Sequence, residues 1–463
     1  MLKDADKLVE LRAGKGLDTG IAPSVLPSAG AVWRDAKQVW FAPAHIEQAL
    51  GSKVIIKPVN RKAQAMAQAH VEGKPRLYYE NLGVISYWQD NTDTVLGTLD
   101  AEGSFDLVPW GNWLALTDNI GPLKLWKGSG GFIPIGETEF ARAKIIKKLG
   151  QYLLAFSTDV FPSGFHWSDA SDPETWEPTV NNTAGNLPIR DLDSDIIAVA
   201  DLGMALAMYS REYMMVVQYV GWPEIFGTPT QALSGIGAIS KHSVVSLGKQ
   251  NVGLSKAGIF VTDGTAFEYV DKPLIHRWIQ DNVDWSRSRE VTSYWDEQMG
   301  LVVWSVPTLG GPHRELAVDP KNKAFTFLGD GFGVSVERGV FDNPVVSKND
   351  GIYLHSIYGL TQPNFYLASQ LWSGPTQARL KSWDHMIVEG ECGVAGEHGA
   401  EIRVGFSNVP RMSGVEWLPW EPFRYQFPFG PRESIFLAVE FRAPTSIKIA
   451  AITVFGKLAG AVA

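Results

Sequence analysis

The stretch HSVVSLGKQNVGLSKAGIFVTDGTAFEYV, residues 242–270, decides the fold. It consists of short apolar segments separated by turns. The Asp-Gly pair within Thr262–Thr265 is typical of a β-hairpin, because these residues accept positive φ. Lys348–Gly351 contains the same pair. Such stretches predict short antiparallel strands joined by tight turns.

A loose form of this pattern recurs along the chain: an alternating apolar strand, a Gly or Asp turn, a second apolar strand and an aromatic residue. The spacing of roughly 40 residues is that of a four-stranded propeller blade. We therefore predict an all-β chain with a β-propeller of about six or seven blades. An array of β-sandwiches is the alternative. The segments with this pattern are 76–100, 104–128, 141–169, 195–221, 242–270, 290–329 and 337–359.

One segment, residues 271–285, interrupts the strand pattern. Its apolar residues recur at helical spacing, which predicts one short helix between blades. Asp271 is expected to cap the start of this helix, with Pro273 in the first turn. We expect His276 and Trp278 to be packing residues rather than ligands.

The two ends of the chain differ from the repeats. We divide the chain into an N-terminal segment (1–50), a β-propeller (51–370) and a C-terminal antiparallel sandwich (371–463), with the boundary near Ser373–Gln377. Clean apolar alternation after Tyr366 indicates the sandwich. Apolar residues from both ends are expected to pair in a domain distinct from the propeller: Leu26, Val32, Val39, Ile447, Ile449, Ile452 and Val454.

Composition excludes several classes of protein. With 463 residues the chain is long enough for two domains, and its net charge of −9 argues against nucleic-acid binding through a general basic surface. A single cysteine excludes a disulfide framework, and no Cys/His spacing suggests zinc. The start lacks the apolar stretch of a signal peptide. We expect a chain that is cytosolic when made and does not insert into membranes.

The stretch GFHWSDASDPETWEP, residues 164–178, allows three interpretations: a sugar-cleaving site, a calcium loop, or a corner between strands. Glycosidases need two or three carboxylates that face one pocket. Asp169, Asp172 and Glu174 lie too close together, within one turn, to be assigned that role. The stretch partly resembles the structural Asp-box hairpin of sialidase propellers. We expect the two tryptophans to be buried and to anchor adjacent strands of a blade, with Asp-Pro at the corner between them. The aspartates are expected to bond to backbone N–H groups of their own turn. The corner residues are Trp167, Asp169, Asp172, Pro173 and Trp176.

A second acidic run places Asp191, Asp193 and Asp195 at alternate positions, as a calcium loop would. The EF-hand pattern requires Gly at the sixth place and Glu at the twelfth, where this chain has Ile196 and Leu202. We therefore interpret this run as an acidic turn exposed to solvent. Searches for a nucleophile elbow, a zinc motif and a phosphate loop find nothing. We therefore assign no catalytic residue, cofactor or metal ligand and expect a protein that is not an enzyme.

The stretch GLDTGIAPSVLPSAGAVWRDAKQVWFAPAHIEQALG, residues 16–51, resembles the N-terminal segment of tail hub, or nozzle, proteins of short-tailed bacteriophages, a group that includes packaged-DNA stabilisation proteins. Gln38 replaces the usual Asn, and Ala42-Pro43 replaces the usual Gly. Residues 165–178 and 242–264 also resemble this family. The motif positions in the N-terminal segment are Leu26-Pro27, Gly30–Trp33, Asp35, Gln38–Phe41 and Gly51.

This resemblance implies a structural protein of the virion tail, assembled in the bacterial host cytoplasm. A hexameric ring below the portal and its head-to-tail adaptor would extend and close the DNA channel, without sequence-specific DNA binding. Tail fibres or spikes would attach to its sides. Two alternatives stay open: a propeller glycosidase or depolymerase, and a carbohydrate-binding propeller adhesin.

Overall fold

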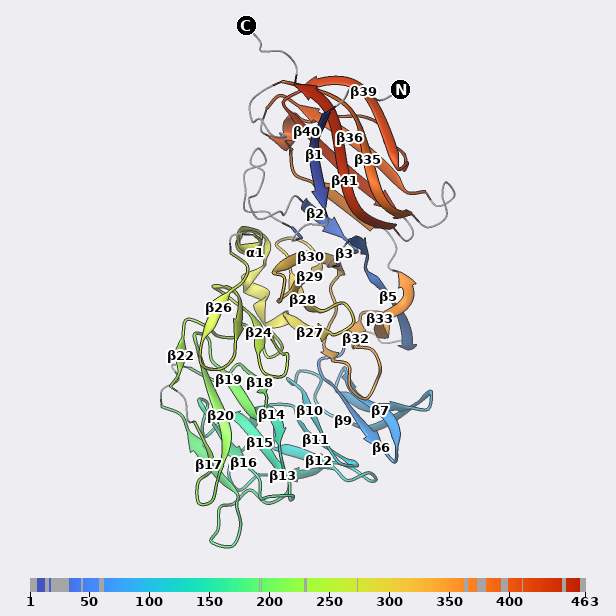
Figure 1. Cartoon of the computed structure of the whole chain (residues 1–463). Helices are drawn as coiled ribbons and strands as arrows, with labels where there is room; N and C mark the ends of the chain where they lie inside the picture. Colours follow the sequence, from blue (N-terminus) through green and yellow to red (C-terminus); the bar gives the residue numbers. More distant parts are fainter. Residues whose placement is uncertain are drawn as a thin grey trace.

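The computed structural model describes the greater part of the chain. It has a propeller at one end and a sandwich at the other (Figure 1). The described residues are 6–12, 16–17, 33–42, 45–57, 62–190, 192, 194–228, 231–272, 274–361, 365–372, 380–392, 399–409, 411–443 and 447–458.

Seven antiparallel sheets, each with a core of four strands, make up the propeller. The first blade contains β6 (Met66–Val71), β7 (Lys74–Asn81), β8 (Val84–Gln89) and β9 (Thr92–Thr98). The second contains β10 (Asp106–Trp110), β11 (Trp113–Thr117), β12 (Leu123–Trp126) and β13 (Ile133–Ile135). The third contains β14 (Ala143–Leu149), β15 (Tyr152–Thr158), β16 (Gly164–Trp167) and β17 (Gly185–Pro188). The fourth contains β18 (Ala198–Leu202), β19 (Ala205–Tyr209), β20 (Tyr213–Gly221) and β21 (Ile225–Gly227), with β22 (Leu233–Ser234) beside β20.

The remaining three blades follow the same order. The fifth contains β23 (Val244–Ser246), β24 (Asn251–Ser255), β25 (Gly258–Thr262) and β26 (Phe267–Tyr269). The sixth contains β27 (Thr292–Asp296), β28 (Leu301–Pro307), β29 (His313–Asp319) and β30 (Ala324–Asp330). The seventh contains β31 (Ser335–Val336), β32 (Val345–Lys348), β33 (Gly351–Thr361) and β5 (Leu50–Ile56).

Contacts between blades show that the sheets form a closed ring. The first strand of each blade contacts the first strand of the next, and β31 of the seventh blade contacts β6 of the first. This is the arrangement of a β-propeller, in which sheets repeat radially around an axis. The predicted propeller is confirmed, and each of the seven sequence repeats falls in one blade.

The ring is closed by a strand from the N-terminal side. β5 precedes the first blade in sequence but pairs antiparallel with β33 as the outermost strand of the seventh. Gly351 makes this approach possible, because a Cβ there would lie 2.8 Å from the carbonyl oxygen of Ile56. The Lys348–Gly351 hairpin is present, but its glycine serves this close contact and not the positive φ expected from the Asp-Gly pair. Gly264 in the other predicted hairpin does have a positive φ, +92°.

Two sheets from both chain ends form the sandwich. The first contains β3 (Val39–Phe41), β4 (Ile46–Gln48), β41 (Ile447–Leu458), β35 (Lys381–Cys392) and β39 (Gln426–Ser434), with β1 (Asp6–Arg12) paired to β41. The second contains β2 (Trp33–Lys37), β34 (Phe365–Ser369), β40 (Phe436–Ala443), β36 (Glu401–Ser407) and β37 (Glu416–Trp417), with β38 (Glu421–Pro422) on β36. The predicted pairing of the chain ends is confirmed, since β1 and β4 both bond to β41.

The apolar residues predicted for this domain share one core where they are described. Val39, Ile447 and Ile449 are at most 1% exposed and belong to one cluster, together with Ile452 and Val454. Leu26, Val32 and the boundary at 373–377 lie outside the described residues. β34 was assigned by sequence to the propeller range 51–370 but belongs to the sandwich, because it pairs with β2 and β40.

Helical structure is limited among the described residues. It comprises α1 (His276–Asn282) and the short 3-10 helices η1 (Trp285–Glu290) and η2 (Met412–Gly414), and no helix in this part of the chain is long and apolar enough to cross a membrane. α1 lies between the fifth and sixth blades, as predicted, but the expected Asp271 cap is wrong. Ile275 occupies the cap position, and the Asp271 carboxylate instead bonds to Nδ1 of His276 at 2.6 Å. Pro273 lies outside the described residues.

A lysine crosses the centre of the propeller. Lys241, in the linker before β23, donates to the carbonyl oxygens of Phe105 at 2.8 Å and Lys144 at 3.1 Å. Its Nζ also lies 3.4 Å from a carboxylate oxygen of Asp106. These partners belong to the second and third blades, which do not adjoin the fifth, so the side chain reaches them across the ring. The axis is therefore occupied at this level.

We predict that ring closure depends on the apolar side of β5. Ile56 is 7% exposed and packs in one cluster with Ile352, Met66 and Val345. Ile56→Ala should lower the free energy of unfolding by about 2–4 kcal/mol, because it removes buried methyl groups and leaves a cavity. Lys53→Ala, at an exposed position of the same strand, should change it by less than about 0.5 kcal/mol. Urea unfolding measures both, and equal effects would contradict this role of β5.

Candidate functional site

The aspartate corner lies between β16 and β17 of the third blade. Oδ1 of Asp169 accepts hydrogen bonds from the backbone N–H groups of Ala170 and Thr183, both at 2.8 Å, and from the Thr183 hydroxyl at 2.6 Å. Asp172 accepts from the backbone N–H of Glu174 at 3.0 Å and from the Thr175 hydroxyl at 2.7 Å. Both carboxylates are thus bound within the loop, as expected from the sequence.

The two tryptophans of the corner are buried on opposite faces of the blade. Trp167 is 5% exposed and packs with Phe226 of the fourth blade, whereas Trp176 is 2% exposed and packs with Phe140, which precedes the third blade. Their clusters are distinct, one between the third and fourth blades and one between the second and third. We expected them on adjacent strands, but Trp176 lies in the loop that Pro173 helps to form. The corner therefore joins three blades.

The second acidic run, with Asp191, Asp193 and Asp195, was considered as a calcium loop. Asp191 and Asp193 lie outside the described residues, and Asp195 pairs with Nζ of Lys144 at 2.5 Å. Within the described ranges no group of His, Cys, Asp and Glu is arranged to hold a metal ion.

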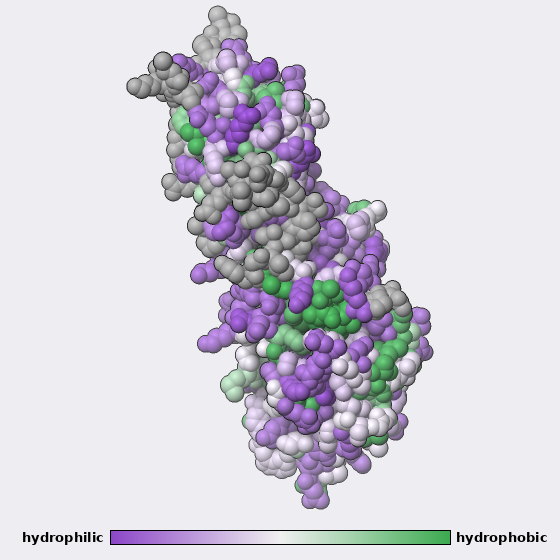
Figure 2. Space-filling model, turned by 90° about the vertical axis from the view of Figure 1, so that its right-hand side faces the viewer, coloured by the Kyte–Doolittle hydropathy of each residue, from purple (hydrophilic) through white to green (hydrophobic). Residues whose placement is uncertain are grey.

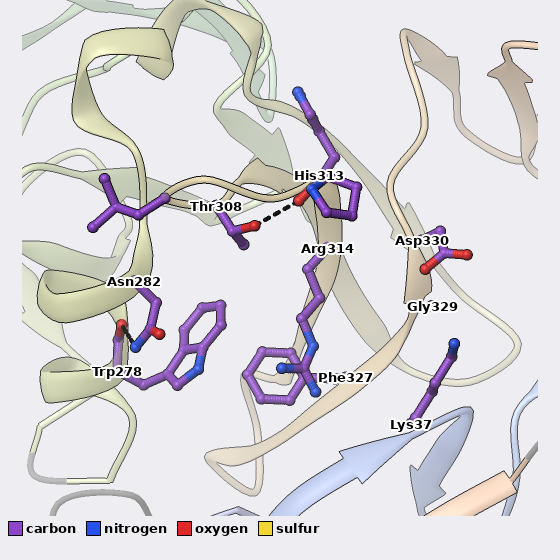
Figure 3. A pocket seen from close by; sticks show the side chains of 11 residues that line it. Lys37, Trp278, Asn282, Thr308, His313, Arg314, Phe327, Gly329 and Asp330 are labelled. Atoms are coloured by element: carbon purple, nitrogen blue, oxygen red, sulfur yellow. Dashed lines mark hydrogen bonds between the residues drawn. The ribbon is translucent and has the colours of Figure 1, made fainter.

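A pocket lies where the sixth blade meets α1 and β2 (Figure 3). Its volume is about 390 Å³, at the lower end of the range for small-molecule sites. Side chains from distant parts of the sequence enclose it. They are Lys37 from β2, Trp278 and Asn282 from α1, Thr308, Leu309 and Pro312 from the β28–β29 loop, His313 and Arg314 from β29, and Phe327, Gly329 and Asp330 from β30.

Arg314 is the most firmly held side chain of the pocket. Its Nη2 donates to Oδ1 of Asp35 at 2.8 Å and to the carbonyl oxygen of Ala36 at 3.0 Å. Its guanidinium carbon lies 3.7 Å from the ring centroid of Phe327, whose ring lies 4.5 Å from that of Trp278. Ion pair, backbone bond and aromatic stacking fix the guanidinium plane before any ligand is bound.

A serine, a histidine and a glutamate behind the pocket have the order of a catalytic triad. Ser305 Oγ lies 3.0 Å from Nδ1 of His313, and Nε2 of that ring lies 2.9 Å from Glu290. However, Ser305 is fully buried and donates its own proton to the carbonyl oxygen of Phe332 at 2.8 Å. A nucleophilic serine must give that proton to the histidine. The arrangement is therefore a hydrogen-bond network that runs from the buried Ser305 to the exposed Glu290, and it does not supply a nucleophile.

The electrostatics of this network agree with a structural role. The Arg287 guanidinium beside Glu290 lowers the pKa of that carboxyl to about 2, so it stays ionised at neutral pH. Burial lowers the pKa of His313. In the pocket itself Asp330 is the one carboxylate among the lining residues, so the paired carboxyl groups of a glycosidase are missing from this lining. The lining can bind a ligand, and it contains one carboxylate and one imidazole.

Sequence reasoning did not find this pocket. Trp278 was predicted to be a packing residue, and it does pack on Phe327, but it also lines the cavity. Lys37 and Arg314 carried no local signal, because nothing near either residue in sequence shows that β2 runs beside β29 and β30. Only the pairing of the N-terminal segment with the sixth blade, through Gln38 N–H to the Leu328 oxygen at 3.0 Å, brings them together.

Fold and pocket define the class, a seven-bladed β-propeller joined to a β-sandwich. No family model matches the sequence, and no curated protein does. Three solved structures are similar to the chain. The computationally designed Ika8 protein is 12% identical, with a TM-score of 0.40 over 66% of this chain and 100% of that one. YCF48 from Cyanidioschyzon merolae is 12% identical, with a TM-score of 0.41 over 66% and 98%. BBS1N in complex with ARL6DN is 10% identical, with a TM-score of 0.43 over 68% and 99%. We transfer no function from them.

We predict that the Asp169 hydrogen bonds stabilise the corner. Burial opposes ionisation of Asp169, but the bonds from Thr183 and Ala170 outweigh it and lower the pKa of the carboxyl. Asp169→Ala should cost about 1–3 kcal/mol of unfolding free energy, because it removes the acceptor of the Thr183 N–H and one of the two acceptors of the Ala170 N–H. Asp169→Asn keeps one oxygen acceptor and should cost less. Urea unfolding at neutral pH distinguishes them, and an unchanged midpoint for Asp169→Ala would refute the prediction.

We also predict that His166 makes stability depend on pH. It is 1% exposed, between Phe140 and Phe161, and burial lowers its pKa to about 4. Between that value and the unfolded pKa near 6.5 only the unfolded chain binds the proton, so stability is lost as pH falls. Its contribution to the loss between pH 7.5 and 5 should be about 2 kcal/mol. Denaturation of His166→Phe at both pH values should show a loss smaller by that amount. An identical pH dependence in both proteins would contradict it.

Proposed function

We propose that this protein is a structural subunit of a phage tail, a hub or nozzle whose copies form a hexameric ring below the portal and adaptor. The ring extends the DNA channel, closes it until infection and serves as the attachment platform for fibres or spikes. The subunit acts mechanically and not as an enzyme.

What supports the proposal most is the part that residues 33–56 play in this structure. They belong to the stretch whose motif resembles the tail hub family. β2, β3 and β4 enter the sandwich, and β5 closes the propeller. Because this segment contributes strands to both halves, its sequence is constrained by both. The link that it forms between propeller and sandwich suits a subunit that must keep a channel closed.

The path of DNA in this proposal lies between copies and not through the propeller. Lys241 occupies the propeller axis, so a duplex cannot pass there. The net charge of −9 suits a conduit wall, because basic side chains would retain the phosphate backbone. The sandwich, built from both chain ends, is then the part that forms the tube, with the propeller projecting outward.

Contact between copies has a candidate surface. On the face shown in Figure 2, hydrophobic side chains gather on the propeller near the joint, whereas the sandwich is mainly hydrophilic. β5 lies on this side of the molecule, and its Val54 and Ile55 are only half-buried. Contiguous apolar surface marks interaction sites in soluble proteins, and this edge strand supports a subunit contact here.

The test is the position of the protein in the particle. Antibodies raised against the purified protein should label the tail end of negatively stained virions, and quantitative mass spectrometry should give the copy number of a hexamer. Absence from purified virions, or label away from the tail axis, would overturn the proposal. Sizing of the isolated protein does not decide it, because a ring of this kind can require the adaptor as a template.

A further inference from the structure

We propose that the pocket between α1, β2 and the sixth blade binds an acidic saccharide, with a hexuronic acid residue as the unit recognised. The inference goes beyond the proposed structural role, because it concerns the isolated subunit and holds whether or not copies form a ring.

Two cationic side chains provide the carboxylate end of the site. Arg314 uses Nη2 for Asp35 and Ala36, and its other N–H groups make no hydrogen bond within the described part of the chain. Lys37 is exposed and has no ion pair among the described residues. An oriented guanidinium whose Nε and Nη1 can still donate, together with an exposed ammonium in the same lining, suits a carboxylate.

Acceptors for sugar hydroxyls lie on the other sides. Asn282 donates its amide N–H to the carbonyl oxygen of Trp278 at 2.9 Å, which fixes its side-chain amide and leaves the oxygen free. Thr308 donates its proton to the Pro312 oxygen at 2.6 Å and can therefore only accept from a ligand. Asp330 is exposed and also accepts. A ligand that fits must donate several hydrogen bonds besides carrying a negative charge.

The apolar wall suits the face of a sugar ring. Trp278 is half-buried against Phe327, and its indole N–H makes no hydrogen bond within the described residues. Leu309, 61% exposed, stands at the rim. An amphipathic ring with one polar tip is a common partner for ligands that have both an apolar face and hydroxyl groups.

These features favour a saccharide over an acidic peptide. Aspartate and glutamate side chains carry the charge but no donors, so an acidic peptide has only its backbone N–H groups to offer Asn282, Thr308 and Asp330, and Asp330 would repel a second carboxylate. A neutral sugar satisfies the acceptors but leaves Lys37 without a counter-charge, whereas Arg314 is already paired with Asp35. Only a ligand with both groups complements the whole lining.

The experiment uses the full chain and trigalacturonic acid as the probe. Saturation-transfer NMR and calorimetry at low salt should show binding with a Kd below about 1 mM, weakened by added salt. Lys37→Gln should raise the Kd about tenfold, the loss expected for one charge-assisted hydrogen bond. Lys321→Gln, an exposed lysine at the opposite end of the β29–β30 hairpin, is the matched control and should leave the Kd unchanged.

Three outcomes would overturn the inference. One is the absence of saturation transfer at millimolar probe. Another is an equal Kd for trigalacturonic acid and its carboxyl-reduced neutral form, or for Lys37→Gln and the unchanged protein. The third is tighter binding of an Asp/Glu oligopeptide that displaces the sugar, which would assign the pocket to a protein ligand. Because Lys37 is exposed and has no ion pair with the described residues, its substitution tests the site without threatening the fold, and none of these results depends on the virion test.

Discussion

Trp33 lies where the propeller, the sandwich and the N-terminal segment meet. It is 1% exposed and packs edge-on against Trp372, at 6.3 Å between ring centroids, and Phe441, at 6.4 Å. The same hydrophobic cluster continues into the sixth blade through Phe325 and Phe327. The two halves therefore share one uninterrupted core. Burial of large aromatic surface supplies most of the stabilising energy at such a joint.

The pocket depends on this shared core. β2 is held against the sixth blade by the bonds of Arg314 to Asp35 and to the Ala36 oxygen. The next strand, β3, is held by Thr326 Oγ1, which donates to the Val39 oxygen at 2.6 Å. Lys37 of this strand therefore lines the same pocket as Arg314, and Asp35 from the same strand orients the guanidinium. If the halves moved as separate domains, the cavity would open whenever they parted. The continuous core makes the pocket a built feature of the molecule, with side chains held before a ligand arrives.

Much of this architecture is readable from sequence, for a physical reason. Neighbouring strands of a blade follow each other closely in sequence. An apolar run followed by a turn, as at Thr262–Thr265, therefore predicts a hairpin formed within a few residues. The corner at 164–178 is similar, because an aspartate that bonds to its own loop needs no distant partner. The predicted start of α1 is wrong because the Asp271 carboxylate bonds to the His276 side chain five residues later, a local contact that competes with capping.

The pocket and the place of β34 could not be predicted, since both follow from which distant strands become neighbours.

The closing strands set the order in which this chain can fold. β5 can pair only after β33 has been synthesised, and β1 only after β41. The propeller and the sandwich therefore both depend on contacts between an N-terminal strand and a strand much later in the chain. Such high contact order slows folding, because loop-closure entropy is paid before the contacts form. A chain cut short on the ribosome lacks the partner of β1 and leaves sheet edges unpaired. Only a chain translated through β41 can therefore complete the first sheet of the sandwich.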